Sequence, residues 1–155
     1  MPENHAIIDV ETMAAMSGLT YLKAMMRGDV PRMPIEKTLG FEIVEADEGR
    51  TVFASVPGVA HYNAIATVHA GYTATLLDSC MACAVLSTLP KGTGFTTMEF
   101  KVSLLRPMTK DTGPVRAEGT MLSRGRRGAV AEGRLTDQRG KLIAHATTTC
   151  LIFSF

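Results

Sequence analysis

Apolar and polar residues follow patterns that predict one helix, two strands, a second helix and four more strands. From Asp9 to Arg27, apolar side chains recur at helical spacing, and Gly28 ends the pattern. The apolar positions are mainly methionine and leucine: Met13, Met16, Leu19, Leu22, Met25 and Met26. Such a stripe is typical of a packing surface, although soft methionines can also line an adaptable acyl site. We predict one helix over residues 9–27.

The middle of the chain predicts a hairpin and then a buried helix. Phe41–Ala46 and Thr51–Val56 read as strands, and Asp47-Glu48-Gly49 between them is a hairpin signal. The segment from Ala70 to about Thr88 is apolar on almost every side. It also contains many small residues: Gly71, Ala74, Ser79, Ala82 and Ala84. A helix of this kind must be covered all round, and small side chains let a sheet approach it closely.

The last third of the chain predicts a sheet. Four segments rich in β-branched residues are separated by turn signals: Thr96–Leu105, Gly113–Ser123, Gly128–Thr136 and Lys141–Phe153. Short links between long strands favour antiparallel pairing. The sequence therefore predicts an α+β fold in which a long antiparallel sheet curls around one central helix.

Composition narrows the class of protein. The length of 155 residues suits a single domain with its own core, and the net charge of +1 gives no reason to expect a nucleic-acid partner. Cys80, Cys83 and Cys150 lie in apolar surroundings, and no second cysteine pair or histidine cluster completes a zinc site. We therefore expect buried structural thiols, no metal and no cofactor.

Two observations concern the membrane. Val68–Leu89 is long enough to span a bilayer, but Asp78 at its centre would cost ~2.5–3.5 kcal/mol there. The N-terminus lacks the short apolar core of a signal peptide. We therefore expect a cytoplasmic protein without a membrane partner.

The residues that open the central helix carry the first candidate chemistry. Backbone N–H groups at a helix start are unpaired, and the helix dipole favours negative charge there. The amides of Ala70 and Gly71 can therefore polarise a carbonyl group, and the amide of Asn63 can donate to a water or carbonyl nearby. Alternatively, His69 only caps the helix and Gly71 only packs. The stretch alone leaves both interpretations open.

Asp78 is the second candidate. A carboxylate in an apolar helix can act as a general base or nucleophile, and burial raises its pKa. Alternatively, it accepts hydrogen bonds from neighbouring serines or threonines in a structural network. Nine residues of helix separate it from His69, which is roughly 13–14 Å. The two side chains therefore cannot form a dyad within one chain, so either they are unrelated or a second subunit completes each site.

A strongly basic turn is the third candidate. Between Ser123 and Gly128 it consists of Arg124, Gly125, Arg126 and Arg127. Arginines on a glycine-containing turn suit phosphate through bidentate, charge-assisted contacts. The alternative is a solvated hairpin tip.

With these motifs in place, the sequence resembles the PaaI-like, or phenylacetate-pathway, branch of hotdog thioesterases. The run His61–Asp78 carries His-x-Asn, then His-Ala-Gly, then Leu-Leu-Asp. Leu39-Gly40-Phe41, Leu105-Arg106-Pro107 and Gly140–His145 also match, and the resemblance extends from Ile35 to Phe153. It implies a hotdog domain over residues 35–155 behind an N-terminal helical extension over residues 1–34.

The resemblance implies roles for individual residues. The amide of Ala70 would bind the thioester carbonyl, although the branch commonly has Gly at this position, while Asn63 and His69 orient substrate or water. Asp78 would come from the facing subunit as base or nucleophile, assisted by the hydroxyl of Thr97 on the following strand.

Other residues would bind the substrate. Thr96 is the second choice for the strand hydroxyl, the basic turn would lie near the CoA phosphates, and Tyr62, Tyr72 and Met81 are candidates for the acyl tunnel. The resemblance also implies a homodimer, and a tetramer of two such dimers.

The sequence therefore predicts an acyl-CoA thioesterase, with coenzyme A as part of the substrate. Two alternatives stay open: a hotdog hydratase or dehydratase acting on acyl thioesters, and a non-catalytic acyl-CoA binding module. A binding module would need the basic turn but not Asp78.

Overall fold

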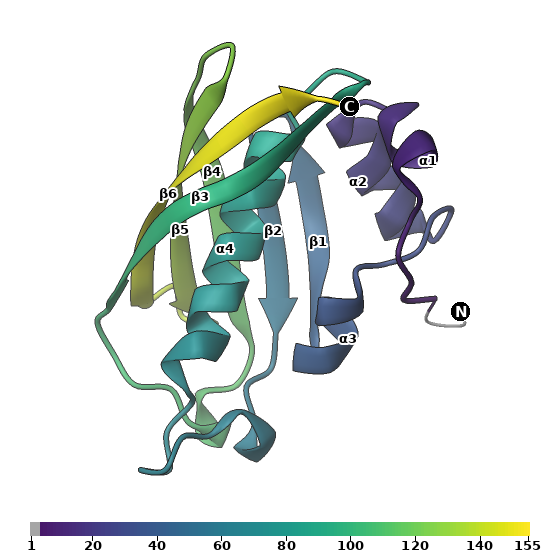
Figure 1. Ribbon diagram of the computed structural model, residues 1–155. Helices are drawn as coiled ribbons and strands as arrows, with labels where there is room; N and C mark the ends of the chain where they lie inside the picture. The colour runs from purple at the N-terminus through teal and green to yellow at the C-terminus, as the bar shows by residue number, and fades with distance from the viewer. Residues whose placement is uncertain (1–3) are drawn as a thin grey trace.

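One long helix lies inside a curved antiparallel sheet in the computed structural model, which describes residues 4–155 (Figure 1). This helix is α4 (Ala70–Leu86), and most of its residues are buried. His69 caps its first turn, since its side chain accepts a hydrogen bond from Gly71 N–H. The helix ends at Leu86, ahead of Pro90.

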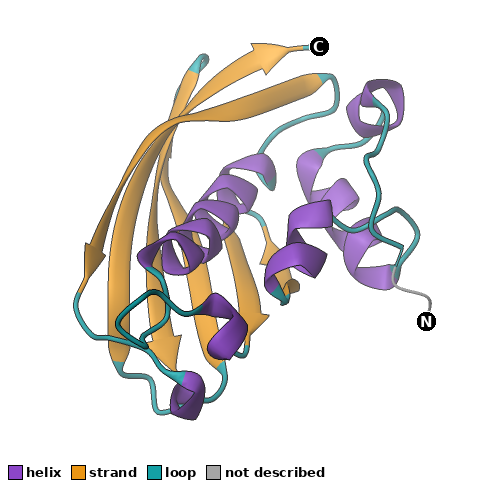
Figure 2. Cartoon of the chain, turned by 60° about the horizontal axis from the view of Figure 1, so that its bottom comes forward, coloured by secondary structure: helices purple, strands orange, loops and turns teal. Residues whose placement is uncertain are grey.

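Six strands form the sheet. They are β1 (Phe41–Asp47), β2 (Arg50–Ser55), β3 (Thr93–Leu104), β4 (Val115–Arg124), β5 (Gly128–Asp137) and β6 (Leu142–Ser154). Their order is β1-β2-β4-β5-β6-β3, and every pairing is antiparallel. Figure 2 shows the sheet wrapping around α4. The predicted α+β architecture is confirmed, and β1 and β3 are the two edges of the sheet.

The sheet and α4 touch at the middle of the helix. A Cβ atom added to Gly119 on β4 would lie 2.2 Å from the carbonyl oxygen of Cys80, so only glycine fits there. The same carbonyl oxygen accepts a hydrogen bond from Thr51 Oγ1 on β2 (2.8 Å). The sequence pointed to small residues on the helix, whereas the closest approach uses a glycine on the sheet.

The predicted single helix over residues 9–27 is wrong in one respect, because the chain forms two helices there. They are α1 (Val10–Ala14) and α2 (Gly18–Arg27), and Ser17 caps the second one. The break occurs where α2 meets the end of α4. Gly18 N–H donates to Leu89 O (3.0 Å), and a Cβ at Gly18 would lie 1.8 Å from Leu86 O. The apolar periodicity continues across this break, which is why the pattern alone predicted one helix.

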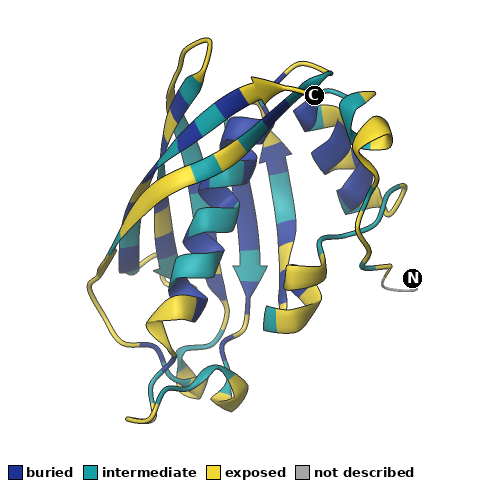
Figure 3. Ribbon diagram, viewed as in Figure 1, coloured by how far each residue is buried: buried dark blue, intermediate teal, exposed yellow. Residues whose placement is uncertain are grey.

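The N-terminal part of the chain packs along β1. Helix α2 buries Tyr21, Leu22 and Met25, and the short helix α3 (Pro34–Leu39) follows. Figure 3 shows the buried face of α2 turned toward the rest of the molecule. Met25 is wholly buried, so this methionine belongs to the core. Two short 3-10 helices lie in the connections. One is η1 (Val59–His61), which precedes α4, and the other is η2 (Lys110–Thr112), which follows β3.

The prediction that the three cysteines are buried thiols is confirmed. Cys80, Cys83 and Cys150 are all free and buried, and burial raises the pKa of the Cys83 thiol to about 12. Separately, no helix within residues 4–155 combines the length and the apolar character needed to cross a membrane.

Replacing Gly119 by Ala should destabilise the protein by about 1–3 kcal/mol, because the added methyl group overlaps the Cys80 carbonyl and forces the helix and sheet apart. The measurement is the free energy of unfolding in denaturant at fixed protein concentration. Gly58→Ala is the matched control, since its Cβ would meet nothing within 4 Å. Equal stability of the two variants would contradict this account of the helix–sheet contact.

Candidate functional site

The loop before α4 is held by its own side chains. Asn63 Oδ1 accepts from the backbone N–H groups of Ile65 (3.0 Å) and Thr67 (3.2 Å), and Asn63 Nδ2 donates to Thr67 Oγ1 (2.9 Å). Ala66 adopts a positive φ of 60° in this turn. Asn63 therefore shapes the loop, and one N–H of its amide remains for another acceptor.

Three exposed residues at the start of α4, His69, Ala70 and Gly71, carry backbone or ring hydrogen-bond donors. Gly71 N–H is engaged, since it donates to His69 Nδ1 (2.8 Å). Ala70 N–H forms no hydrogen bond within residues 4–155. Because Nδ1 of His69 accepts, the neutral ring carries its proton on Nε2. Of the two amides predicted to polarise a carbonyl, the Ala70 amide is the one with no partner.

Asp78 lies two turns further along α4, half-buried, beside β3. Thr97 Oγ1 donates to Asp78 Oδ1 (3.0 Å), so the strand hydroxyl predicted to assist does meet the carboxylate. Within the described chain, no hydrogen bond to Asp78 Oδ2 is formed. Thr96 is exposed, and because adjacent strand residues face opposite sides, it points away from α4.

A β-bulge lies directly beside this contact. The register of β3 and β6 shifts between Thr97 and Glu99, and Thr148 Oγ1 donates to Glu99 O (2.8 Å) next to the extra residue. Bulges re-aim side chains, and this one follows the threonine that contacts Asp78. Cys150 lies opposite Thr97 in the same register. Sequence reasoning missed this neighbour, because only strand register reveals it.

Burial raises the pKa of Asp78 above its usual value, and the hydrogen bond from Thr97 lowers it in part. A carboxylate with a raised pKa is a stronger base than an exposed one. The side chain remains half-buried rather than enclosed, so water can reach it. Asp78 therefore has the properties of a general base.

Ala70 and Asp78 are too far apart to act on one carbonyl. Eight residues of helix separate them, a rise of about 12 Å. A cavity of about 260 Å³ adjoins the helix start and is lined by Asn63, Thr67, Val68, Ala70, Thr73 and residues 104–108. Asp78 does not line it. One chain thus carries the two groups at two separate places.

The sequence identified Leu105, Arg106 and Pro107 only as part of a family motif, and not Leu104 or Met108. Their approach to Ala70 follows from the hydrogen bond between Val68 N–H and Met108 O (2.9 Å), which ties the end of β3 to the loop before α4. This contact joins segments forty residues apart, so no local signal predicts it.

The basic turn lies at the other end of α4. Arg124 donates through Nη1 to Thr88 O, just beyond the helix C-terminus. From Ala70 to Leu86 the helix rises about 24 Å, so the turn does not face the helix start of its own chain. Arg126 and Arg127 are exposed at the tip, with Gly125 between Arg124 and Arg126.

The three residues predicted for the acyl tunnel have other contacts. Tyr62 Oη accepts from Lys110 N–H (2.8 Å) and so joins the loop to η2. Tyr72 is buried, its hydroxyl meets Ser55 Oγ, and its ring stacks on His61 with centroids 4.2 Å apart. Met81 is fully buried. In the single chain, Tyr72 and Met81 belong to the core.

Within residues 4–155, no group of three histidine, cysteine, aspartate or glutamate side chains is placed to hold a metal ion.

Comparison with known proteins gives the family. A model of the thioesterase superfamily matches residues 66–144, which is half of the chain and includes α4, β3, β4 and β5. Among proteins with curated descriptions, no relative matches.

Comparison with solved structures supports the same family. A phenylacetic acid degradation-related protein of Ralstonia eutropha JMP134 is 33% identical, with 84% of this chain and 98% of that chain covered and a TM-score of 0.76. A thioesterase family protein of Silicibacter pomeroyi is 26% identical, covering 86% and 99% of the two chains, with a TM-score of 0.77. The Escherichia coli PaaI protein shares the fold at 21% identity, with 90% of this chain and 96% of that chain covered and a TM-score of 0.76.

The raised pKa of Asp78 predicts how substitution changes stability with pH. A carboxyl group with a raised folded-state pKa favours folding while protonated, and this contribution is lost as pH rises through the folded pKa. Asp78→Asn should therefore be more stable than wild type at neutral pH, and its advantage should shrink as pH falls through the folded pKa of Asp78. The measurement is the thermal midpoint of both proteins between pH 3 and pH 8.

Asp111→Asn is the control, because that carboxylate is exposed at the surface. An Asp78→Asn advantage that is absent at neutral pH, or that grows as pH falls, would contradict the assignment of a raised pKa to Asp78.

Proposed function

Since the chain belongs to the thioesterase superfamily and has the PaaI-like hotdog fold, we propose that it hydrolyses acyl-CoA thioesters to free acids and CoA at sites shared by two subunits. The observation that carries the proposal is the pairing of Asp78 with Thr97 about 12 Å along the helix from the unpartnered Ala70 amide. One group suits base catalysis and the other suits an oxyanion, but a single chain separates them.

The Ala70 amide would hold the carbonyl oxygen. It lies at the first position of α4, where the helix dipole and the unpaired N–H both favour negative charge. As water adds, the carbonyl oxygen becomes an oxyanion, so this donor stabilises the transition state more than the substrate. His69 Nε2–H and the remaining Asn63 N–H are donors in the same region.

Asp78 would take a proton from the attacking water. The hydroxide so formed bonds to the carbonyl carbon, the tetrahedral oxyanion collapses, and the C–S bond breaks to release the CoA thiolate. The thiolate takes up the proton that Asp78 removed from water, which restores the carboxylate. Thr97 holds Oδ1, which leaves Oδ2 to face the water. Direct attack by Asp78 on the carbonyl, with an anhydride intermediate, is the alternative route.

The exposed edge of the sheet supports a two-subunit site. The free edge of β3 exposes apolar side chains: Met98 (64%), Phe100 (41%) and Leu104 (52%). An unpaired edge with apolar side chains is a liability unless another strand covers it. If two β3 strands pair antiparallel about a twofold axis, the Thr97 end of one strand comes beside the Leu104 end of the other. Asp78 of one subunit would then approach the Ala70 cavity of its partner.

The same pairing suggests where CoA lies. Arg124 contacts Thr88 just beyond the end of α4, and the helix rises about 12 Å from Asp78 to this end. The basic turn of the subunit that supplies Asp78 would therefore lie within reach of the phosphates of an extended CoA molecule. For the acyl group we propose an aryl-acetyl or a short to medium chain, since two similar proteins carry phenylacetic acid degradation in their names. We also propose a tetramer of two such dimers.

Asp78→Asn should lower the rate of thiol release from phenylacetyl-CoA or a medium-chain acyl-CoA by ~10²–10⁴-fold, the usual scale for loss of a general base. Affinity for CoA should be unchanged. Ser79→Ala, next to Asp78 on the same helix, is the matched control and should keep wild-type turnover. A binding module would show no turnover in either protein, and a hydratase would show β-hydroxyacyl chemistry without thiol release.

Ala70→Pro tests the oxyanion donor and the shared site together. Proline is accepted at the first position of a helix, and His69 already has the extended backbone (φ −61°, ψ 139°) that precedes proline. The variant therefore replaces the N–H hydrogen by a ring carbon and leaves the helix start intact. Each of Ala70→Pro and Asp78→Asn alone should be impaired. When the two variants are co-expressed and pair at random, about half of the dimers are mixed, and each mixed dimer has one intact site of two. The mixture should therefore regain about a quarter of wild-type activity.

Separately purified variants that are assayed without subunit exchange serve as the control for this mixing experiment. Activity of the mixed dimers that stays at the level of the single variants would show that Ala70 and Asp78 do not meet across an interface.

A further inference from the structure

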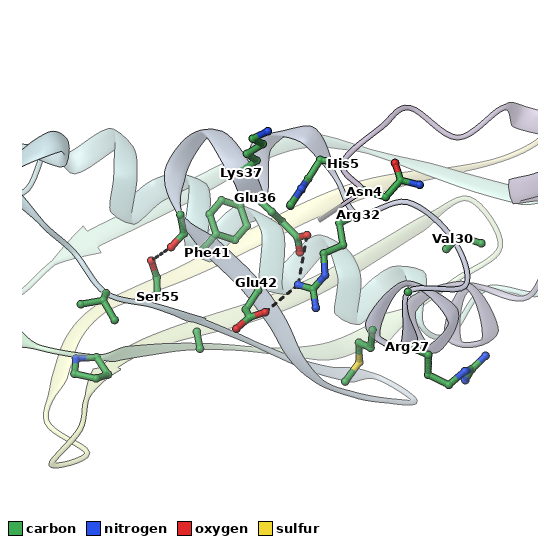
Figure 4. Close-up of a pocket in the computed structure, with 16 residues that line it drawn as sticks. Asn4, His5, Arg27, Val30, Arg32, Glu36, Lys37, Phe41, Glu42 and Ser55 are labelled. Atoms are coloured by element: carbon green, nitrogen blue, oxygen red, sulfur yellow. Dashed lines mark hydrogen bonds and ion pairs between the residues drawn. The ribbon is translucent and has the colours of Figure 1, made fainter. Parts of the chain in front are cut away.

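A second cavity lies on the opposite side of the molecule, against the β1 edge of the sheet. Its volume is about 570 Å³, within the range of small-molecule sites. The N-terminal segment, the end of α2, α3, and β1 with β2 surround it (Figure 4). It shares no lining residue with the cavity beside Ala70. This site is therefore separate from the one proposed for thioester hydrolysis.

Glu36 supplies an unusual feature of this cavity. Its carboxyl group is completely buried, and Oε1 accepts a hydrogen bond from Ile43 N–H (3.3 Å). Among residues 4–155, Oε2 finds no hydrogen-bond partner, and Arg32 Nη1 lies 3.9 Å away. Burial raises the pKa of Glu36, which favours the protonated form. Since Oε1 accepts from the backbone, the proton belongs on Oε2, which then needs an acceptor.

His5 brings a second unpaired polar atom into the same place. Its Nδ1 is buried and has no hydrogen-bond partner in the part of the chain that the structure describes. Two backbone hydrogen bonds fix the segment that carries it, from Arg32 N–H to Asn4 O (2.8 Å) and from Ala6 N–H to Arg32 O (3.2 Å). A buried polar atom without a partner is costly, and such atoms gathered in one cavity indicate a ligand that would satisfy them.

The charge of the lining favours an anion. Arg27, Arg32 and Lys37 line the cavity, and Arg27 is paired with Asp29 (2.7 Å), so Arg32 and Lys37 carry the charge that faces a ligand. Among the lining residues within 4–155, Glu42 is the single carboxylate besides Glu36. Arg32 bonds Glu42 through Nη1 (3.0 Å), which leaves its other nitrogens for a ligand. The remaining wall is largely apolar: Met26, Val30, Phe41, Val56 and Pro114.

We propose that this cavity binds a small organic carboxylate with an apolar body. One carboxylate oxygen accepts from the Glu36 Oε2 hydroxyl and the other pairs with the Arg32 guanidinium, while the apolar body lies against Phe41 and Met26. Nδ1 of His5 supplies a further donor in the tautomer that carries the proton on this atom. The N-terminal segment forms one wall of the cavity. The site therefore depends on the N-terminal extension as well as on the sheet.

Calorimetric titration with benzoate at pH 6 tests this proposal. Benzoate should bind to wild type and to Asp78→Asn alike, because the cavity does not include the thioester site. The neutral amide benzamide should bind at least about tenfold more weakly, since it lacks the charge that pairs with Arg32. Inorganic phosphate should also bind more weakly, because it has no apolar body.

Substitutions identify the site. Arg32→Met and Glu36→Leu should each weaken benzoate binding at least about tenfold. Glu36→Gln should retain it, because the amide N–H donates where the carboxyl hydroxyl does. Arg139→Met, at an exposed hairpin tip, is the control and should bind as wild type does. Thermal midpoints measured alongside distinguish lost binding from lost folding.

Absence of benzoate binding to wild type at millimolar concentration would overturn the proposal, as would equal affinity for benzoate and benzamide. Unchanged binding by folded Arg32→Met would also overturn it, whether or not Glu36→Leu folds. Loss of benzoate binding in Asp78→Asn would show that the ligand occupies the thioester site instead.

Discussion

The enclosure of α4 is the constraint on which the rest of the structure depends. A helix that is apolar on nearly every side gains stability only if its whole circumference leaves water, and the sheet achieves this by curling around it. Contact is closest at Cys80, whose carbonyl oxygen meets Gly119 and accepts from Thr51. Because a glycine and a hydroxyl both engage this one carbonyl, the helix cannot slide along the sheet without losing packing and a hydrogen bond.

This fixed placement determines what chemistry the protein can perform. A rigid helix keeps the Ala70 amide and the Asp78 carboxylate a constant distance apart, and the bulge in β3 aims Thr97 at the carboxylate. Neither group alone activates water and stabilises an oxyanion. The exposed apolar edge of β3 offers a physical reason for a second subunit to approach at the required place. In this proposal, the strand that needs a partner for stability also brings the two halves of the site together.

Much of this could be predicted from the sequence, because local pattern and tertiary requirement agree. The strands follow from their composition and turns, and Asp78 stands out as a charge in an apolar helix. The rest depends on contacts between distant segments. The break before Gly18 arises where α2 meets Leu86, and apolar periodicity does not record it. The Glu36 cavity was not predicted, since it appears only when residues 5, 32, 36 and 43 are brought together by the fold.

In the proposed mechanism, one active site uses Ala70 of one subunit and Asp78 of the other. A crystal structure of the Asp78→Asn variant with an acyl-CoA substrate bound tests it most directly. The account predicts that the thioester carbonyl oxygen lies within hydrogen-bonding distance of Ala70 N–H, and that position 78 of the facing subunit lies on the other side of the carbonyl carbon. A carbonyl bound away from Ala70, or flanked by both groups from the same chain, would contradict it.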